Sequence, residues 1–212
     1  MKKELIIDIT KELIKSYPEA KCSLDFTTPF EMLVAVCLSA QCTDERVNQV
    51  TPTLFKEYDT PNEFANADLN KLEKLIHSCG FYKNKAKNLK AAGQYILDNY
   101  NGEVPNTPEE LIKIPGVGRK SANVIMLEAF NNPVGIAVDT HVKRISKRIG
   151  FTKQQEPEKI EKDLLKNIPK EYWKDVNHTF IYHGRSTCKA PTPKCDICPI
   201  KNKCEYYKKN NK

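Results

Sequence analysis

One stretch decides the fold: Leu111-Ile112-Lys113-Ile114-Pro115-Gly116-Val117-Gly118-Arg119-Lys120-Ser121. Two short amphipathic segments flank its Pro-Gly-Val-Gly turn, where Gly116 and Gly118 can adopt positive φ angles and allow another backbone to come close. The turn ends where a second helix is expected to begin, and the N–H groups at a helix start suit a phosphate. The stretch therefore predicts a hairpin between two helices that grips a nucleic-acid backbone, with the amine of Lys120 just inside the second helix.

The composition is compatible with this prediction. The 212-residue chain has a formal net charge of +7, which favours a polyanion as partner, although a solvated lysine-rich surface explains the charge equally well. No apolar run approaches the roughly 20 residues of a membrane span, and the N-terminal residues lack the apolar core of a signal peptide. We therefore expect a cytoplasmic protein, whose eight cysteines are thiols or metal ligands rather than disulfides.

Helical periodicity covers most of the chain. Thr-Pro-x-Glu segments at Thr28, Thr60 and Thr107 have the pattern of capping boxes with proline at the first helical position. The predicted helices span 4–17, 30–38, Asp44 onward with a bend or break at Pro52, Asp68 to a stop at Gly80, 83–100, 107–114, 119–130, Asp139 to Gly150, 157–167, and 172–183 closed by Gly184. Asp44, Asp68 and Asp139 are expected to be the N-caps of their helices. Residues 134–138 are either a strand or a buried extended connection, and the tail from Lys208 is expected to be disordered. The pattern predicts an all-α protein.

Four cysteines lie close together near the C-terminal end, namely Cys188, Cys195, Cys198 and Cys204, in the spacing C-x6-C-x2-C-x5-C. The compact quartet indicates a four-thiolate metal site, and both zinc and a [4Fe–4S] cluster accept such ligands. The spacing alone does not choose between the two. Lys189 and Lys194 lie inside the first loop, where they either reach a phosphate or are simply solvated. The other four cysteines, at positions 22, 37, 42 and 79, are interpreted as buried thiols without a chemical role.

Three signatures together resemble the endonuclease III DNA glycosylases of the helix-hairpin-helix superfamily: Ile114-Pro-Gly-Val-Gly-Arg-Lys120, Ile136-Ala-Val-Asp-Thr-His141, and the cysteine quartet. The resemblance runs from about residue 4 to 206. It implies a [4Fe–4S] cluster on the four cysteines and two helical domains. A six-helix domain would cover 22–132 and a cluster domain would join 1–21 to 133–212, with double-stranded DNA across the cleft between them and the protein acting as a monomer.

The resemblance also implies a reaction. Members of this type remove an oxidised pyrimidine from duplex DNA and then nick the strand, after the damaged nucleotide has left the stack. Lys120 would attack C1′ as a neutral amine and form a Schiff base, and β-elimination would break the 3′ C–O bond. Asp139 would stabilise positive charge at the sugar and assist proton transfer. Gln41 would fill the gap left by the flipped nucleotide, and Phe81 would occupy the position of a wedge in the base stack, where bacterial members usually carry an aliphatic residue.

The neutral amine requires a large change at Lys120. An unperturbed lysine has a pKa of about 10.4, so half-deprotonation at pH 7 needs a drop of roughly 3 units, or about 4 kcal/mol. A helix N-terminus supplies about 0.3–1 kcal/mol, up to ~2 kcal/mol when partly buried. Desolvation in the closed cleft must supply most of the remainder, and the neighbouring charge of Arg119, which also faces DNA in this interpretation, adds repulsion.

Two alternatives remain open from the sequence. A monofunctional adenine or mismatch glycosylase of the same superfamily would share the fold and the cluster but does not use a lysine nucleophile. A non-catalytic iron–sulfur module that binds DNA would need neither Lys120 nor Asp139. The presence of both residues favours the glycosylase with lyase activity.

Overall fold

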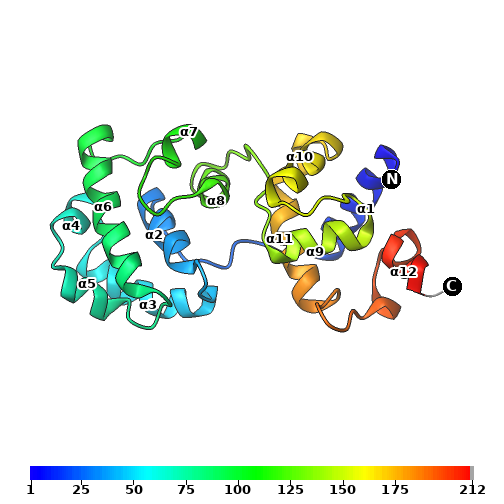
Figure 1. The fold of residues 1–212 in the computed structure, drawn as a ribbon, viewed down its shortest axis with the longest axis horizontal. Helices are drawn as coiled ribbons and strands as arrows, with labels where there is room; N and C mark the ends of the chain where they lie inside the picture. Colours follow the sequence, from blue (N-terminus) through cyan, green and yellow to red (C-terminus); the bar gives the residue numbers. More distant parts are fainter. Residues whose placement is uncertain (211–212) are drawn as a thin grey trace. The chain divides into compact units, whose positions relative to one another are not determined.

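The computed structural model describes residues 1–210, and every regular element in that range is a helix (Figure 1). The chain divides into two compact units. Unit 1 joins Met1–Cys22 to the chain from Gly135 onward, and unit 2 is Ser23–Val134. Because residues 1–210 contain no strand, the all-α prediction is confirmed. Among these residues, no helix is both long and apolar enough to cross a membrane.

Unit 2 is built around two helices that contact most of the others. Its elements are α2 (Pro29–Ser39), α3 (Asp44–Glu57), α4 (Pro61–Asn66), α5 (Leu69–Leu75), α6 (Tyr82–Tyr100), α7 (Pro108–Leu111) and α8 (Arg119–Phe130). Phe30 and the seven successive residues Met32–Leu38 of α2 are buried, and α2 packs on α3, α6 and α8. Helix α6 also packs closely on α4, since a Cβ at Gly93 would lie 2.5 Å from the Pro61 carbonyl oxygen.

Side-chain caps start several of these helices. The boxes at Thr28 and Thr60 both form, each with a glutamate three residues later bonding back to the cap, as predicted. The box predicted at Thr107 is wrong: its hydroxyl donates to the Glu110 carboxylate at 2.8 Å and accepts no backbone N–H, although Pro108 still opens α7. Substituting a neutral residue for a cap commonly costs about 1 kcal/mol, so these local signals are energetically significant.

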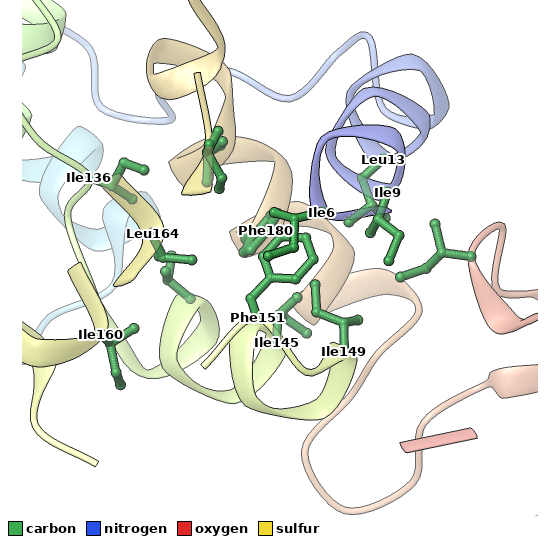
Figure 2. Packing of buried hydrophobic residues seen from close by; sticks show 14 of the residues in the cluster. Ile6, Ile9, Leu13, Ile136, Ile145, Ile149, Phe151, Ile160, Leu164 and Phe180 are labelled. Atoms are coloured by element: carbon green, nitrogen blue, oxygen red, sulfur yellow. The ribbon is translucent and has the colours of Figure 1, made fainter. Parts of the chain in front are cut away.

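In unit 1, the first helix of the chain packs against helices that come much later in the sequence. Its elements are α1 (Lys3–Ser16), α9 (Thr140–Ile149), α10 (Pro157–Asn167), η1 (Lys170–Tyr172), α11 (Trp173–Ser186), η2 (Cys195–Ile197), η3 (Lys201–Lys203) and α12 (Glu205–Asn210). Figure 2 shows Ile6 and Ile9 of α1 close to Phe180 of α11, with Ile145 and Ile149 of α9 nearby. Full burial of each such side chain stabilises the fold by about 1.5–3 kcal/mol, so this cluster is the core of the unit.

The segment 134–138 is an extended connection and forms no strand. Ile136 and Ala137 are buried, and the side-chain amide of Asn177 donates to the Ala137 carbonyl at 2.7 Å. A backbone carbonyl left without a partner in the core would cost free energy. The Asn177 amide therefore supplies the hydrogen bond that a neighbouring strand would otherwise donate.

Four sequence-based predictions fail in detail. Helix α3 continues through Pro52 and is capped by Thr43, so Asp44 is its first residue and not its cap. Gly184 lies within α11 and does not end it; a Cβ there would lie 2.6 Å from His141 Nδ1, so α11 needs glycine for close packing on α9. The tail is helical as far as Asn210, and the rest of the tail predicted to be disordered lies outside the described residues.

Candidate active site

The predicted hairpin is present between α7 and α8. The amide of Val117 donates to the Ile114 carbonyl at 3.0 Å, which closes a tight turn, and α8 begins at Arg119. Leu111, Ile114 and Val117 are buried and anchor the hairpin in unit 2. The second residue of α8 is Lys120, whose side chain is exposed. The hairpin therefore presents a primary amine at a helix N-terminus, where the backbone dipole favours anionic groups.

The two glycines of the turn differ. Gly116 has a φ of +85° and lies against α6, where an added Cβ would be 3.2 Å from the Asn88 side chain. Gly118 has a φ of −96°, so the expectation that it uses positive φ is wrong: it caps α8 in an extended conformation that any residue can adopt. A Cβ at Gly118 would meet nothing within 4 Å. Gly116 is thus required by the fold, whereas Gly118 leaves open space at the start of the helix.

Gln41 and Phe81 lie on two adjacent turns of unit 2. Both have left-handed backbones, with φ of +53° for Gln41 and +58° for Phe81. An added Cβ at Gly80 would lie 3.3 Å from the Gln41 carbonyl oxygen, which places the two turns side by side. The Phe81 ring is 66 % exposed. Because a bulky residue with positive φ is strained, and such strain gathers at functional sites, the two exposed side chains are candidates for contacts with a ligand.

Asp139 is the N-cap of α9, as predicted. Its Oδ1 accepts a hydrogen bond from the Val142 amide at 2.7 Å. The side chain is half-buried, and its charge acts on His141. Burial lowers the pKa of His141, and the nearby Asp139 carboxylate opposes that change only in part. At neutral pH the histidine is therefore uncharged, and the hydrogen bond to α9 holds the Asp139 side chain in a fixed orientation.

The four cysteines predicted as ligands line one cavity in unit 1. They are Cys188, Cys195, Cys198 and Cys204, and they share the lining of this cavity with Arg148 and Tyr206 among others. Burial raises the pKa of Cys198 to about 11 and also raises the pKa of Cys195 and Cys204, and the neighbouring thiols add to each shift. The thiols of Cys195, Cys198 and Cys204 are therefore protonated at neutral pH, and a metal centre would have to displace their protons.

Arg148 holds the loop that follows the first of these cysteines. Its guanidinium donates to the carbonyls of Lys189 and Ala190, each at 2.6 Å, and approaches the Cys188 sulfur at 3.4 Å. Its other face stacks on the Tyr206 ring at 4.9 Å. The planar guanidinium group has five N–H donors, so it can bind two carbonyls of the same loop at once. This contact could not be predicted from the sequence, because Arg148 lies 40 residues before the loop.

Lys189 and Lys194, the two lysines of that loop, are exposed. The Lys194 amide donates to the Thr187 carbonyl at 2.9 Å, so the loop is closed on its own base. Within residues 1–210 no group of three or more His, Cys, Asp or Glu side chains is arranged to hold a metal ion.

A buried hairpin between two short helices in an all-helical chain defines the class of helix-hairpin-helix proteins. Comparison with protein families matches residues 34–170 to the HhH-GPD superfamily of base excision DNA repair proteins. A curated relative, endonuclease III of Synechocystis sp., is 50 % identical over 96 % of this chain and 93 % of its own length. The chain belongs to the endonuclease III family within this superfamily, the DNA glycosylases with AP lyase activity that act in base excision repair.

Solved structures agree over the whole chain. A trapped endonuclease III–DNA covalent intermediate is 46 % identical, with a TM-score of 0.94 and complete coverage of both chains. A non-covalent endonuclease III–DNA complex is 47 % identical, with a TM-score of 0.93 over 100 % of this chain and 99 % of that one. The family and the fold indicated by the three sequence signatures are therefore confirmed.

Proposed function

We propose that this protein removes oxidised pyrimidines from duplex DNA and cleaves the strand 3′ to the resulting abasic site by β-elimination. The observation that carries the proposal is the exposed amine of Lys120 at the N-terminus of α8, directly after the hairpin turn. Support comes from the 46 % identical relative that was trapped as a covalent intermediate with DNA. The protein acts where its substrate is, on the DNA in the cytoplasm.

Lys120 is the nucleophile in this proposal. Its neutral amine attacks C1′ of a nucleotide that has left the stack, the base departs with the electrons of the glycosidic bond, and the amine and C1′ form a Schiff base. Loss of a proton from C2′ then expels the 3′ phosphate, and water releases the amine. Because Lys120 is exposed in the free protein, the bound DNA must supply the low-dielectric surroundings that favour the neutral amine.

Asp139 supplies the carboxylate of the reaction. Its Oδ1 caps α9, and we assign the charge of the group to stabilising the positive sugar as the base leaves. The cap fixes the carboxylate before substrate arrives, so no reorganisation is needed when charge develops. Since His141 is neutral beside it, no histidine ion pair competes for that charge.

DNA contacts are assigned to both units. Gln41 and Phe81 fill and wedge the base stack, because adjacent strained turns hold both side chains out to solvent. Gly116, Gly118 and Arg119 bring the hairpin backbone to a phosphate. Lys189 and Lys194 contact phosphates from the cysteine loop of unit 1, which we regard as the cluster domain, while unit 2 is the domain of the hairpin.

A [4Fe–4S] cluster is the group that fits the four cysteines best. Each cysteine of such a cluster binds a different iron atom, so the sulfurs need to surround a cavity, whereas the ligands of a zinc ion must converge on one point. The four cysteines line one common cavity, as the ligands of a multi-iron cluster must. Bound there, the cluster would cross-link the segment 188–204, and Arg148 would hold the loop with Lys189 in place.

The proposed function is tested with a duplex that carries one oxidised pyrimidine and a 5′ label. We expect the purified protein to produce a shorter labelled strand with a 3′ unsaturated aldehyde, and borohydride to convert the intermediate into a stable protein–DNA adduct. Release of the base without nicking or adduct formation would instead indicate a monofunctional glycosylase.

The two glycines of the hairpin provide a matched pair of variants. Gly116→Ala is expected to lower the free energy of unfolding by about 1–2 kcal/mol, because alanine is strained at positive φ. Gly118→Ala should leave stability unchanged, since its Cβ meets open space, yet weaken DNA binding about tenfold, or ~1.4 kcal/mol, by holding the phosphate away. Urea unfolding and DNA titration at physiological salt measure the two effects. Wild-type affinity in Gly118→Ala would contradict the assigned phosphate contact.

A further inference from the structure

Unit 2 contains a buried ammonium surrounded by thiols that the reaction does not use. Lys85 of α6 is 7 % exposed, and its Nζ donates to the Leu38 carbonyl at 2.8 Å. Its charge acts on the sulfurs of Cys37, Cys42 and Cys79. A lysine is rarely buried without a carboxylate partner. Here the Leu38 carbonyl and the three thiols surround the ammonium in place of a carboxylate. The cysteines therefore lie beside a positive charge.

Cys42 and Cys79 are direct neighbours in that environment. The Cys42 side chain is near enough to act on the Cys79 thiol, and both cysteines are reduced in the structure. The residues next to them, Gln41 and Gly80, also lie side by side, since a Cβ at Gly80 would be 3.3 Å from the Gln41 carbonyl oxygen. Two cysteines on adjacent backbone turns are the arrangement from which a disulfide can form. Cys37 is directed elsewhere, with its sulfur 3.7 Å from the Gly116 carbonyl.

The two thiols differ in access to solvent. Cys42 is partly exposed, whereas Cys79 is completely buried. Burial raises the pKa of Cys79 to about 11, with Cys42 adding to the change and the Lys85 charge opposing it. A dissolved oxidant can therefore reach Cys42 first, and Cys79 lies beneath it.

We propose that Cys42 and Cys79 are a redox modification site that forms a disulfide when the protein meets a peroxide. The Cys42 thiolate attacks the O–O bond, takes one oxygen as sulfenic acid, and the other oxygen leaves as water. The sulfur of Cys79 then attacks the Cys42 sulfur, the S–S bond forms, and the hydroxyl leaves as a second water. Two electrons pass from the two sulfurs to the peroxide, and the bond is reversed by a dithiol.

This bond would join the two turns that carry Gln41 and Phe81. Each turn is one residue or two from a linked cysteine, so the turns could no longer move apart. If these side chains enter the base stack, as the proposed function states, the oxidised protein would adapt less well to a flipped nucleotide. The consequence for DNA rests on the proposed function, but formation of the disulfide does not.

The disulfide is tested by peptide mapping of the full protein. After treatment with hydrogen peroxide and alkylation of remaining thiols, we expect trypsin to yield peptide Cys22–Arg46 linked to peptide Leu75–Lys83, with a mass two hydrogens below the sum. Cys42→Ser must lose this linked peptide. Cys22→Ser, which changes another partly exposed cysteine of the same peptide, must keep it. Unlinked peptides with oxygen added at Cys42, or a link through Cys22 or Cys37, would overturn the proposal.

A second measurement separates the disulfide from its consequence. We expect peroxide to slow borohydride trapping by the wild type and dithiothreitol to restore the wild-type rate. In Cys42→Ser, which cannot form the disulfide, neither reagent should change the trapping rate. Because Cys42→Ser keeps all five cysteines of unit 1, it controls for oxidation there. If the linked peptide forms but trapping is unchanged, the disulfide exists and only its effect on DNA is refuted. If the reduced wild type traps no DNA, the proposed function is refuted, whereas the linked peptide would still support the disulfide.

Discussion

Replacing Lys120 by glutamine is expected to abolish the covalent protein–DNA adduct. The amide side chain has a similar length but no nucleophilic lone pair, so neither the Schiff base nor the β-elimination can occur. Strand cleavage should fall by at least about a thousandfold, as expected for loss of a nucleophile. Gel electrophoresis after borohydride treatment measures the adduct, and the labelled strand measures the cleavage. Trapping as efficient as in the wild type would show that another amine reacts.

Two controls separate chemistry from binding and folding. Lys120→Gln removes one exposed charge, so its affinity for damaged DNA should stay within a few-fold of the wild type. Asp139→Asn removes the carboxylate charge but retains an oxygen that can accept from the Val142 amide, and asparagine caps helices as well as aspartate does. This second variant should therefore keep wild-type stability while base release slows. A stability loss in Asp139→Asn would mean that the residue acts mainly as a cap.

Replacing Cys198 by serine is expected to remove the metal centre. The wild type, purified without oxygen, should be brown with broad visible absorption from iron and sulfide. With one of four thiolates lost, the absorption should disappear and the segment 188–204 should loosen. Lys189 and Lys194 would then no longer be held, so DNA affinity should fall, and the slope of log affinity against log salt should decrease by roughly 2.

Cys22→Ser is the matched control for this variant. Cys22 is a partly exposed cysteine that does not line the cavity, so the absorption and the salt dependence should both stay as in the wild type. Metal analysis distinguishes the two four-thiolate centres. One zinc ion per chain in anaerobically purified protein would exclude the iron–sulfur cluster.

The sequence predicted those features that depend on local chemistry. Thr28 and Thr60 with their glutamates specify helix starts within four residues, and Asp68 and Asp139 cap their helices as predicted. Predictions failed where packing between distant segments decides the outcome. Gly184 looks like a helix stop in the sequence, but α11 keeps it because α9 comes too close for a Cβ.

The surroundings of Lys85 were the largest omission. Helix α6 carries lysines at positions 83, 85, 87 and 90, and nothing in the sequence distinguishes the one that is buried. Its partners come from segments about 40 residues away and from a turn before the helix. The cysteines at 42 and 79 were interpreted as unrelated thiols because their contact depends on left-handed turns at Gln41 and Phe81. Neither glutamine nor phenylalanine is a residue type that predicts such a turn.

Unit 1 is built from the chain segments that precede and follow unit 2 in the sequence, and this order has a consequence for synthesis on the ribosome. Helix α1 is translated before unit 2, with Ile6, Ile9 and Leu13 exposed, but its partners α9 and α11 begin 124 (140 − 16) and 157 (173 − 16) residues after α1 ends at Ser16. At about 5–20 residues per second, this apolar stripe waits roughly 6–31 s. Unit 2 is one continuous segment, Ser23–Val134, and can fold in that interval. A nascent chain therefore carries a finished hairpin unit and an unpaired amphipathic helix, which makes α1 the segment most in need of a chaperone.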